Sequence, residues 1–160
     1  VLSVDELIQV GKDGSIERGA KAIEGASLLV MESKEVEVKK MLTVMTKVVS
    51  DGKLEKESIV KGLYDPLQFL SDLEIDAPLA RNHLAMIVVE CLKLGALPSL
   101  EFLKEAPEYF HTDGKPAAFT VKVLKMRGGD PSEDELAVVR ALMTEDDKKA
   151  FDSGKAMFEA

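Results

Sequence analysis

The chain has 160 residues, of which 46% are hydrophobic and 31% charged; this balance suits one folded domain with a continuous core and argues against a disordered chain. Its formal net charge of −8 argues against direct binding to nucleic acid, because neutralising phosphates requires a clustered basic surface. The single cysteine, Cys91, excludes an internal disulfide and fits a reducing compartment, so we expect a soluble cytoplasmic or nuclear protein.

The apolar residues favour packed helices over a β-sandwich. Aromatic residues make up only 5% of the chain and Trp is absent, whereas β-sandwiches are rich in aromatic and β-branched alternation. The most apolar run, Leu84–Leu97, contains Glu90 and Lys93 and is too short to span a bilayer. The chain does not begin with methionine, so we interpret it as an excised piece of a longer protein.

Helical periodicity, with apolar residues at i, i+3, i+4 and i+7, recurs along the chain. It is strong in Glu35–Ser50 and Pro78–Leu94 and weaker in Lys56–Leu70 and Ala117–Met126. Turn-forming residues separate the periodic segments at 12–15, 50–53, 95–99, 112–115 and 128–132. The pattern predicts an all-α fold of eight or nine helices with short connections. Such a series is typical of a HEAT-like stack of antiparallel helical hairpins, an α-solenoid.

The C-terminal segment, residues 130–160, is strongly acidic. It holds nine acidic and four basic residues, a net charge of −5. Ser132 followed by Glu135 predicts a capping box at a helix start. We therefore divide the chain into a helical domain, 1–129, and an acidic helical extension, 130–160, packed on it. Such a segment usually forms a pair of helices whose acidic side chains are solvated, and the alternative is that the acids form a contact surface for a partner.

The sequence offers few groups that could perform catalysis. If His83 and Cys91 lie on one helix, they are separated by about 12 Å along its axis and cannot form a dyad. We expect Cys91 to be a core thiol, His83 a surface or boundary residue, and His111 a loop residue near a helix end. The histidines and the cysteine lack zinc-site spacing, and no phosphate-binding or hydrolase motif is present. The sequence predicts a protein that is not an enzyme and holds no cofactor or metal.

The stretch "SDLEIDAP", Ser71–Pro78, places Asp72 and Asp76 four residues apart. On a helix this spacing brings both carboxylates to one face, while Leu73 and Ile75 are expected to contact the body of the domain. Asp76 is also a candidate helix N-cap, because proline is favoured in a helix's first turn. From spacing alone, one cap and one solvated acid, or two acids presented to a basic partner, both remain open.

At this point the chain resembles the MA3 domain family of translation initiation scaffolds and translation inhibitors. The resemblance centres on "DLEIDAPLARNHLAMIVVECLKLGAL", Asp72–Leu97, which is similar to the family's pattern of an acid, three residues, "DxP" and an apolar helix. It extends back to Ala26 and forward through "PAAFTVKVLKMRGG" to Gly129, about two thirds of the chain.

The resemblance implies a HEAT-like domain that docks on a DEAD-box RNA helicase, initiation factor 4A. We expect the chain itself to be a monomer. The family's helicase-contacting acids correspond to Asp72 and Asp76, Pro78 shapes the loop, and Glu74 belongs to the same expected contact surface. Exposed carboxylates on a rigid turn can accept charge-assisted hydrogen bonds from a partner's Arg or Lys.

Three other hypotheses remain. A generic helical adaptor would bind through the acidic segment 130–160 or a hydrophobic groove. An enzyme on an unfamiliar helical scaffold would need a deep pocket with convergent polar groups. An RNA-binding domain would show retention on RNA that falls steeply with salt.

Overall fold

The computed structural model describes residues 56–95 and 97–160, together with seven earlier positions: Ala20, Lys21, Glu24, Lys40, Thr43, Val44 and Lys47. Most of the predicted helix Glu35–Ser50 lies outside the described residues, as do the predicted turns at 12–15 and 50–53. The four described positions between 40 and 47 are helical.

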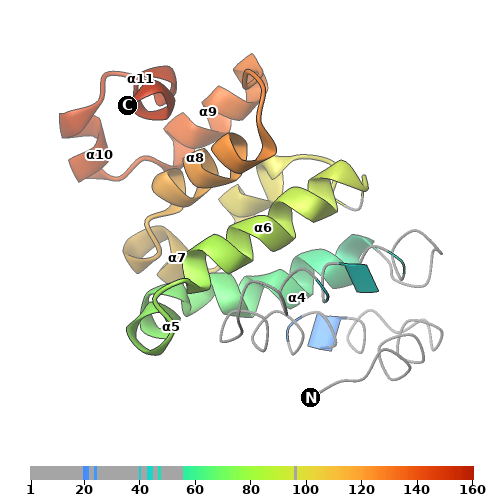
Figure 1. The fold of residues 1–160 in the computed structure, drawn as a ribbon. Helices are drawn as coiled ribbons and strands as arrows, with labels where there is room; N and C mark the ends of the chain where they lie inside the picture. Colours follow the sequence, from blue (N-terminus) through green and yellow to red (C-terminus); the bar gives the residue numbers. More distant parts are fainter. Residues whose placement is uncertain are drawn as a thin grey trace.

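The described part of the chain is all-helical, as predicted, and contains no strand. Its elements are α4 (Lys56–Gln68), α5 (Leu70–Asp76), α6 (Ala80–Lys93), the 3₁₀ helix η1 (Leu100–Glu105), α7 (Glu108–Asp113), α8 (Pro116–Arg127), α9 (Glu133–Leu142), α10 (Glu145–Ala150) and α11 (Gly154–Glu159). They form a layered stack from α4, through α6 and α8, to α9 and α11 (Figure 1), an α-solenoid-like arrangement of packed helices.

α6 lies at the centre of this stack. The predicted apolar stripe is buried in full, and so are residues beside it: Ala80, Leu84, Ile87, Val88 and Cys91 on the stripe, with His83, Ala85 and Val89 alongside. α6 packs against α5 and against α8, so its buried arc is wider than the stripe of a helix covered on one side. The structure ends the predicted helix Lys56–Leu70 at Gln68 and begins α5 at Leu70, but the predicted apolar stripe, Ile59, Leu63, Leu67 and Leu70, is completely buried.

The junction between α7 and α8 is a tight turn. Gly114 ends α7, Lys115 adopts the left-handed conformation (φ 50°, ψ 62°), and Pro116 opens α8. Proline suits this first position, where a helix has no use for a backbone N–H. Below the turn the Phe110 and Phe119 rings meet edge to face with their centroids 5.8 Å apart, a favoured aromatic geometry that fixes α7 to α8.

The predicted capping box at the start of α9 is confirmed. Ser132 Oγ accepts from the Glu135 N–H at 3.2 Å, and Glu135 Oε1 accepts from the Ser132 N–H at 2.9 Å. α10 begins with a second such box, formed by Thr144 and Asp147. α9 packs on α8 and η1, and α11 packs on α9 and α8. The proposed boundary at residue 129 stays a prediction.

Candidate interaction surface

Asp72 and Asp76 both lie on α5, and both side chains are exposed. Four residues of helix separate them, which corresponds to about 6 Å of rise and about 40° of rotation, so they share a face. Neither carboxylate makes a hydrogen bond or ion pair with any residue that the structure describes. A carboxylate that is exposed and unpaired within the described fold can accept hydrogen bonds from another molecule.

The predicted role of Asp76 as the N-cap of the next helix is wrong. Asp76 is the last residue of α5, and α6 begins only at Ala80, after Leu79, which provides no side-chain cap. Between the helices the chain makes a turn, closed by hydrogen bonds from the Ala77 N–H to the Leu73 carbonyl and from the Ala80 N–H to the Ala77 carbonyl, both 2.9 Å long. Pro78 is exposed within this turn.

Large apolar side chains are exposed beside the two aspartates. Leu73 is partly buried against the core, as expected, but Ile75 is 78% exposed, so its predicted contact with the domain is wrong. The reason is geometric, because residues two apart on a helix are about 200° apart around it and only one of them can face inward. Phe69, three residues before Asp72, is 46% exposed, and Leu79, in the turn that follows α5, is 56% exposed. We call Phe69, Asp72, Ile75, Asp76 and Leu79 the α5 outer face.

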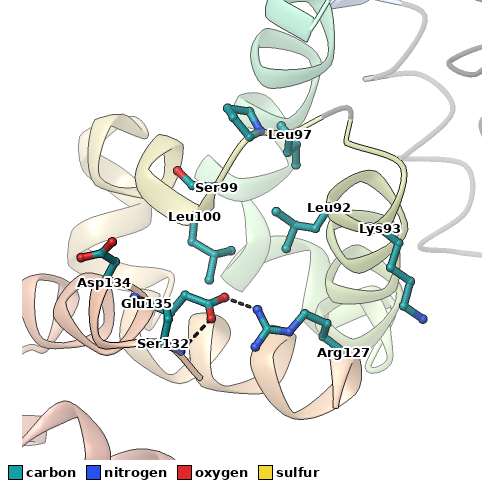
Figure 2. A pocket seen from close by; sticks show the side chains of 10 residues that line it. Leu92, Lys93, Leu97, Ser99, Leu100, Arg127, Ser132, Asp134 and Glu135 are labelled. Carbon is teal, nitrogen blue, oxygen red and sulfur yellow. Dashed lines mark hydrogen bonds and ion pairs between the residues drawn. The ribbon is translucent and has the colours of Figure 1, made fainter. Parts of the chain in front are cut away.

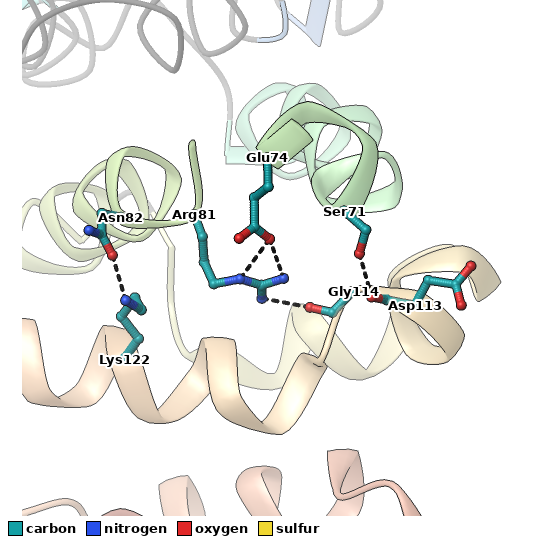
Figure 3. Close-up of polar contacts among 7 residues, drawn as sticks. All are labelled: Ser71, Glu74, Arg81, Asn82, Asp113, Gly114 and Lys122. Atoms are coloured by element: carbon teal, nitrogen blue, oxygen red, sulfur yellow. Dashed lines mark hydrogen bonds and ion pairs between the residues drawn. The ribbon is translucent and has the colours of Figure 1, made fainter. Parts of the chain in front are cut away.

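Polar contacts hold α5 in place from its inner side (Figure 3). The Arg81 guanidinium donates from Nε and Nη2 to Glu74 Oε1, at 2.9 and 2.6 Å, and from Nη1 to the Gly114 carbonyl oxygen at 2.7 Å. Ser71 Oγ donates to the Asp113 carbonyl oxygen at 2.5 Å. Arg81 is only 11% exposed at its side chain, so α5 is fixed to the end of α7 by a nearly buried cation. We call this set the Arg81 clamp.

Glu74 therefore differs from its two neighbours. Its Oε1 atom is held by Arg81 inside the protein, whereas Asp72 and Asp76 point no oxygen at a described donor. Among the four residues expected from the sequence, the structure places Asp72, Asp76 and Pro78 on the exposed side of one helix and its turn. It places Glu74 on the side that contacts α6 and the α7–α8 junction.

Sequence reasoning missed the part of this surface that α7 contributes. Tyr109, which is 60% exposed, and Asp113 line a cavity of about 250 Å³ together with Gln68, Phe69, Ser71 and Asp72. Figure 3 shows the Asp113 side chain directed away from the Arg81 clamp. Phe69 could have been found from its helical spacing to Asp72. Tyr109 and Asp113 could not, because only the packing of α4 and α5 against α7 brings them there.

The histidines and the cysteine give no catalytic pair. Cys91 is buried as predicted, and burial, with a smaller effect of Glu90, raises the pKa of its thiol to about 12. His83 was expected near the surface but is only 4% exposed; it lies three residues after Ala80 and four before Ile87, inside the buried arc of α6. His111 lies in the last turn of α7 rather than in a loop, with Nε2 3.0 Å from the Ala106 carbonyl oxygen.

A second cavity, of about 370 Å³, lies between the end of α6, the start of η1, the end of α8 and the start of α9 (Figure 2). Leu92, Leu97 and Leu100 form its apolar wall, and Lys93 extends away from it. Its Arg127 and Glu135 are joined to each other in an ion pair. Burial opposes ionisation of Glu135, but hydrogen bonds from Arg127 and Ser132 outweigh it and lower the pKa of Glu135. These two groups therefore hold α8 to α9.

Two properties of the described residues bear on metal binding and on membranes. No group of three or more His, Cys, Asp or Glu side chains among them is arranged to hold a metal ion. None of their helices is both long and apolar enough to cross a bilayer.

No protein-family model matches the chain, and no solved structure gives a significant match. Among curated proteins, the eukaryotic translation initiation factor 4 gamma 1 of the rabbit, Oryctolagus cuniculus, is 25% identical over 96 residues. The matched stretch is 60% of this chain but only 7% of the length of that factor. This distant similarity suggests a helical domain related to translation initiation.

Proposed function

We propose that this chain is a non-enzymatic protein-interaction domain of translation initiation or its regulation. In this proposal it docks on the DEAD-box RNA helicase of initiation, initiation factor 4A, through the α5 outer face. The observation that carries the proposal is the presentation of Asp72 and Asp76, both exposed and unpaired among the described residues, on one face of a helix fixed from behind.

The Arg81 clamp supports this proposal energetically. A docking site that is already ordered loses less conformational freedom on binding than a mobile loop. Asp72 and Asp76 lie on a helix whose opposite side is attached to α6 and α7 by Arg81 and Ser71. Two neighbouring carboxylates on a helix that is fixed in this way can set the register of a basic partner surface and speed its association.

The exposed apolar side chains add the second element of a stable interface. Hot spots in protein interfaces are desolvated apolar or aromatic anchors surrounded by polar contacts. Phe69, Ile75 and Leu79 alternate with the two aspartates on the α5 outer face. This mixture fits a partner surface that combines apolar contacts with Arg or Lys.

The similarity to a translation initiation factor supports the cellular context. The relative is by name a translation initiation factor. The resemblance of Asp72–Leu97 to the MA3 pattern makes the DEAD-box helicase initiation factor 4A the partner to test. The acidic-adaptor alternative draws less support, because five of the nine acids of 130–160 already interact with residues of this chain.

The test is the affinity of the purified chain for the purified helicase, measured by calorimetry. The Asp72→Asn/Asp76→Asn double variant should weaken binding by about 2–5 kcal/mol, the usual cost of removing charge partners at an interface. A matched control, Glu133→Gln/Asp152→Asn, removes the same charge from exposed residues of 130–160 and should bind like the unmodified chain.

This control also separates the alternatives. Deleting 130–160 would remove the buried residues Val138 and Val139 and would uncover the side of α8 that packs on α9, so a deletion could not distinguish contact from unfolding. If the control variant loses the helicase and the Asp72/Asp76 variant keeps it, the acidic segment is the docking site. Absence of any helicase binding by the unmodified chain would refute the proposal.

A further inference from the structure

A small pocket with an unusual composition lies at the edge of the α5 outer face. Its volume is about 250 Å³, below the about 300–1,000 Å³ of pockets that hold drug-sized ligands, so it suits a single side chain. Its walls come from the α4–α5 junction with the start of α5 and from α7, and Ser71 Oγ, on the pocket lining, donates to the Asp113 carbonyl oxygen. This hydrogen bond holds the two walls together.

Two aromatic rings line the pocket and remain exposed. Phe69 is 46% and Tyr109 60% exposed, so both rings keep apolar surface that a partner could bury. They come from separate elements, and both border the same cavity. Aromatic faces attract cations, and Tyr or Phe faces within about 6 Å of a cation are the usual arrangement.

Two carboxylates complete the pocket. Asp72 and Asp113 line it, both are exposed, and neither side chain pairs with a described residue. None of the six lining residues is basic. An apolar occupant would remove water from these carboxylates without replacing its hydrogen bonds, which is costly, so the pocket favours a cation.

From this combination we propose that the pocket receives one arginine side chain of the protein partner, with its guanidinium against Phe69 and Tyr109 and paired with Asp72 and Asp113. Arginine fits better than lysine because its guanidinium is planar, weakly hydrated and able to stack on a ring while donating to carboxylates. The inference deepens the proposed function and rests on it for the identity of the partner.

A capped peptide with a single arginine tests the pocket without the helicase. Titrated into the isotope-labelled full chain, it should cause saturable NMR shifts at Phe69, Asp72, Tyr109 and Asp113. The matched probe is the same peptide with citrulline, which keeps the shape and loses the charge. Equal shifts with citrulline, or arginine-induced shifts spread over all exposed acids instead of these four residues, would overturn the inference.

Variants of the pocket sharpen the test. Tyr109→Ala should weaken arginine-peptide binding about 2- to 5-fold, the range of an exposed cation–π contact, while Tyr109→Phe should retain it. Asp113→Asn should weaken it as well, whereas Asp134→Asn, which alters an acid of the other cavity, should have no effect. An effect of Asp134→Asn equal to that of Asp113→Asn would contradict a defined pocket.

The peptide experiment tests the arginine pocket, and the helicase experiment tests the proposed partner, so either claim can be refuted without the other. If the chain binds the arginine peptide as described but not the helicase, the pocket stands and the proposed partner is wrong. If it binds the helicase through Asp72 and Asp76 while Tyr109→Ala and Asp113→Asn leave that affinity unchanged, the proposed function stands and the arginine pocket is wrong.

Discussion

The α5 outer face and the segment 130–160 are both acidic, but they use their acids differently. In 130–160, five of the nine acidic residues interact with the chain itself: Glu135, Glu145, Asp146, Asp147 and Glu159. Glu135 and Asp147 also complete the capping boxes that start α9 and α10. On and beside α5, the carboxylates of Asp72, Asp76 and Asp113 have no described partner.

The comparison shows that net charge alone does not identify a contact surface. In the more acidic region, acidic side chains cap two helices and form ion pairs, one with Arg127 of α8 and three with lysines of the same segment. The less acidic region keeps its charge available on a helix whose orientation is fixed by Arg81. We therefore expect substitutions in 130–160 to change stability, and substitutions of Asp72 and Asp76 to change binding.

The largest expected effect comes from the Arg81 clamp, which supports the α5 outer face. Arg81→Ala should lower the free energy of unfolding by about 2–3 kcal/mol, because the loss of this nearly buried cation leaves Glu74 and the Gly114 carbonyl without their donor. Urea unfolding followed by circular dichroism measures it. Arg140→Ala, an exposed arginine of α9, is the control, and an equal loss there would contradict a special role for the clamp.

The next effect concerns Glu135. Glu135→Ala should cost about 1–2 kcal/mol of stability, since it removes both the ion pair to Arg127 and the hydrogen bond from the Ser132 N–H. Glu135→Gln keeps a capping side chain and should cost less. The measurement is chemical denaturation at neutral pH, and a Gln variant as unstable as the Ala variant would show that the capping bond contributes nothing.

The same residue predicts a pH dependence. The folded-state pKa of Glu135 lies below its ordinary value of 4.5, so the folded protein resists protonation there more than the unfolded chain. Its stabilisation is fully present above that ordinary value and is lost as the pH falls through the lower folded value. Unfolding curves from neutral pH to acid should show a smaller loss in Glu135→Gln than in the unmodified chain; parallel curves would be evidence against this assignment.

A smaller effect is expected at the start of α10. Thr144→Ala removes the side chain that accepts from the Asp147 N–H and should cost about 1 kcal/mol, as typical N-cap losses do. Thr144→Ser preserves the acceptor and serves as the control in the same thermal unfolding experiment. If both variants are equally destabilised, the effect comes from the lost methyl group and not from the lost cap.

The smallest expected effect on stability is at the α5 outer face itself. Asp72→Asn/Asp76→Asn should change the free energy of unfolding by no more than about 0.5 kcal/mol, as for surface residues outside any network. Differential scanning calorimetry of the same protein batches used for binding would measure it. A destabilisation as large as that of Glu135→Ala would mean that the two regions do not differ in the way described above.

Local patterns predicted the helices well. The stripe from Ala80 to Cys91 and the Ser132–Glu135 capping box depend on residues close in sequence, and both are present. Errors arose where distant parts of the chain decide the outcome. His83 is buried because α6 is covered from more than one side, and spacing within α6 does not reveal which neighbours cover it.

The candidate surface was predictable only in part. The spacing of Asp72 and Asp76 gave their common face, and the structure has both exposed on α5. The position of Asp76 at a helix end depends on where α5 stops, which local sequence determines poorly. The exposure of Ile75 follows from helix geometry, because Leu73 and Ile75 cannot both face inward. Tyr109 and Asp113 lie some forty residues away, and only tertiary packing brings them beside Phe69.

The burial of Cys91 gives the molecule a built-in reporter. It is the only sulfhydryl in the sequence, 2% exposed in the last turn of α6, with its pKa raised to about 12. Since alkylating reagents attack the thiolate, labelling in the native state requires α6 to open. The rate of alkylation, followed by mass spectrometry without any introduced probe, would therefore time the opening of the central helix with and without a bound partner.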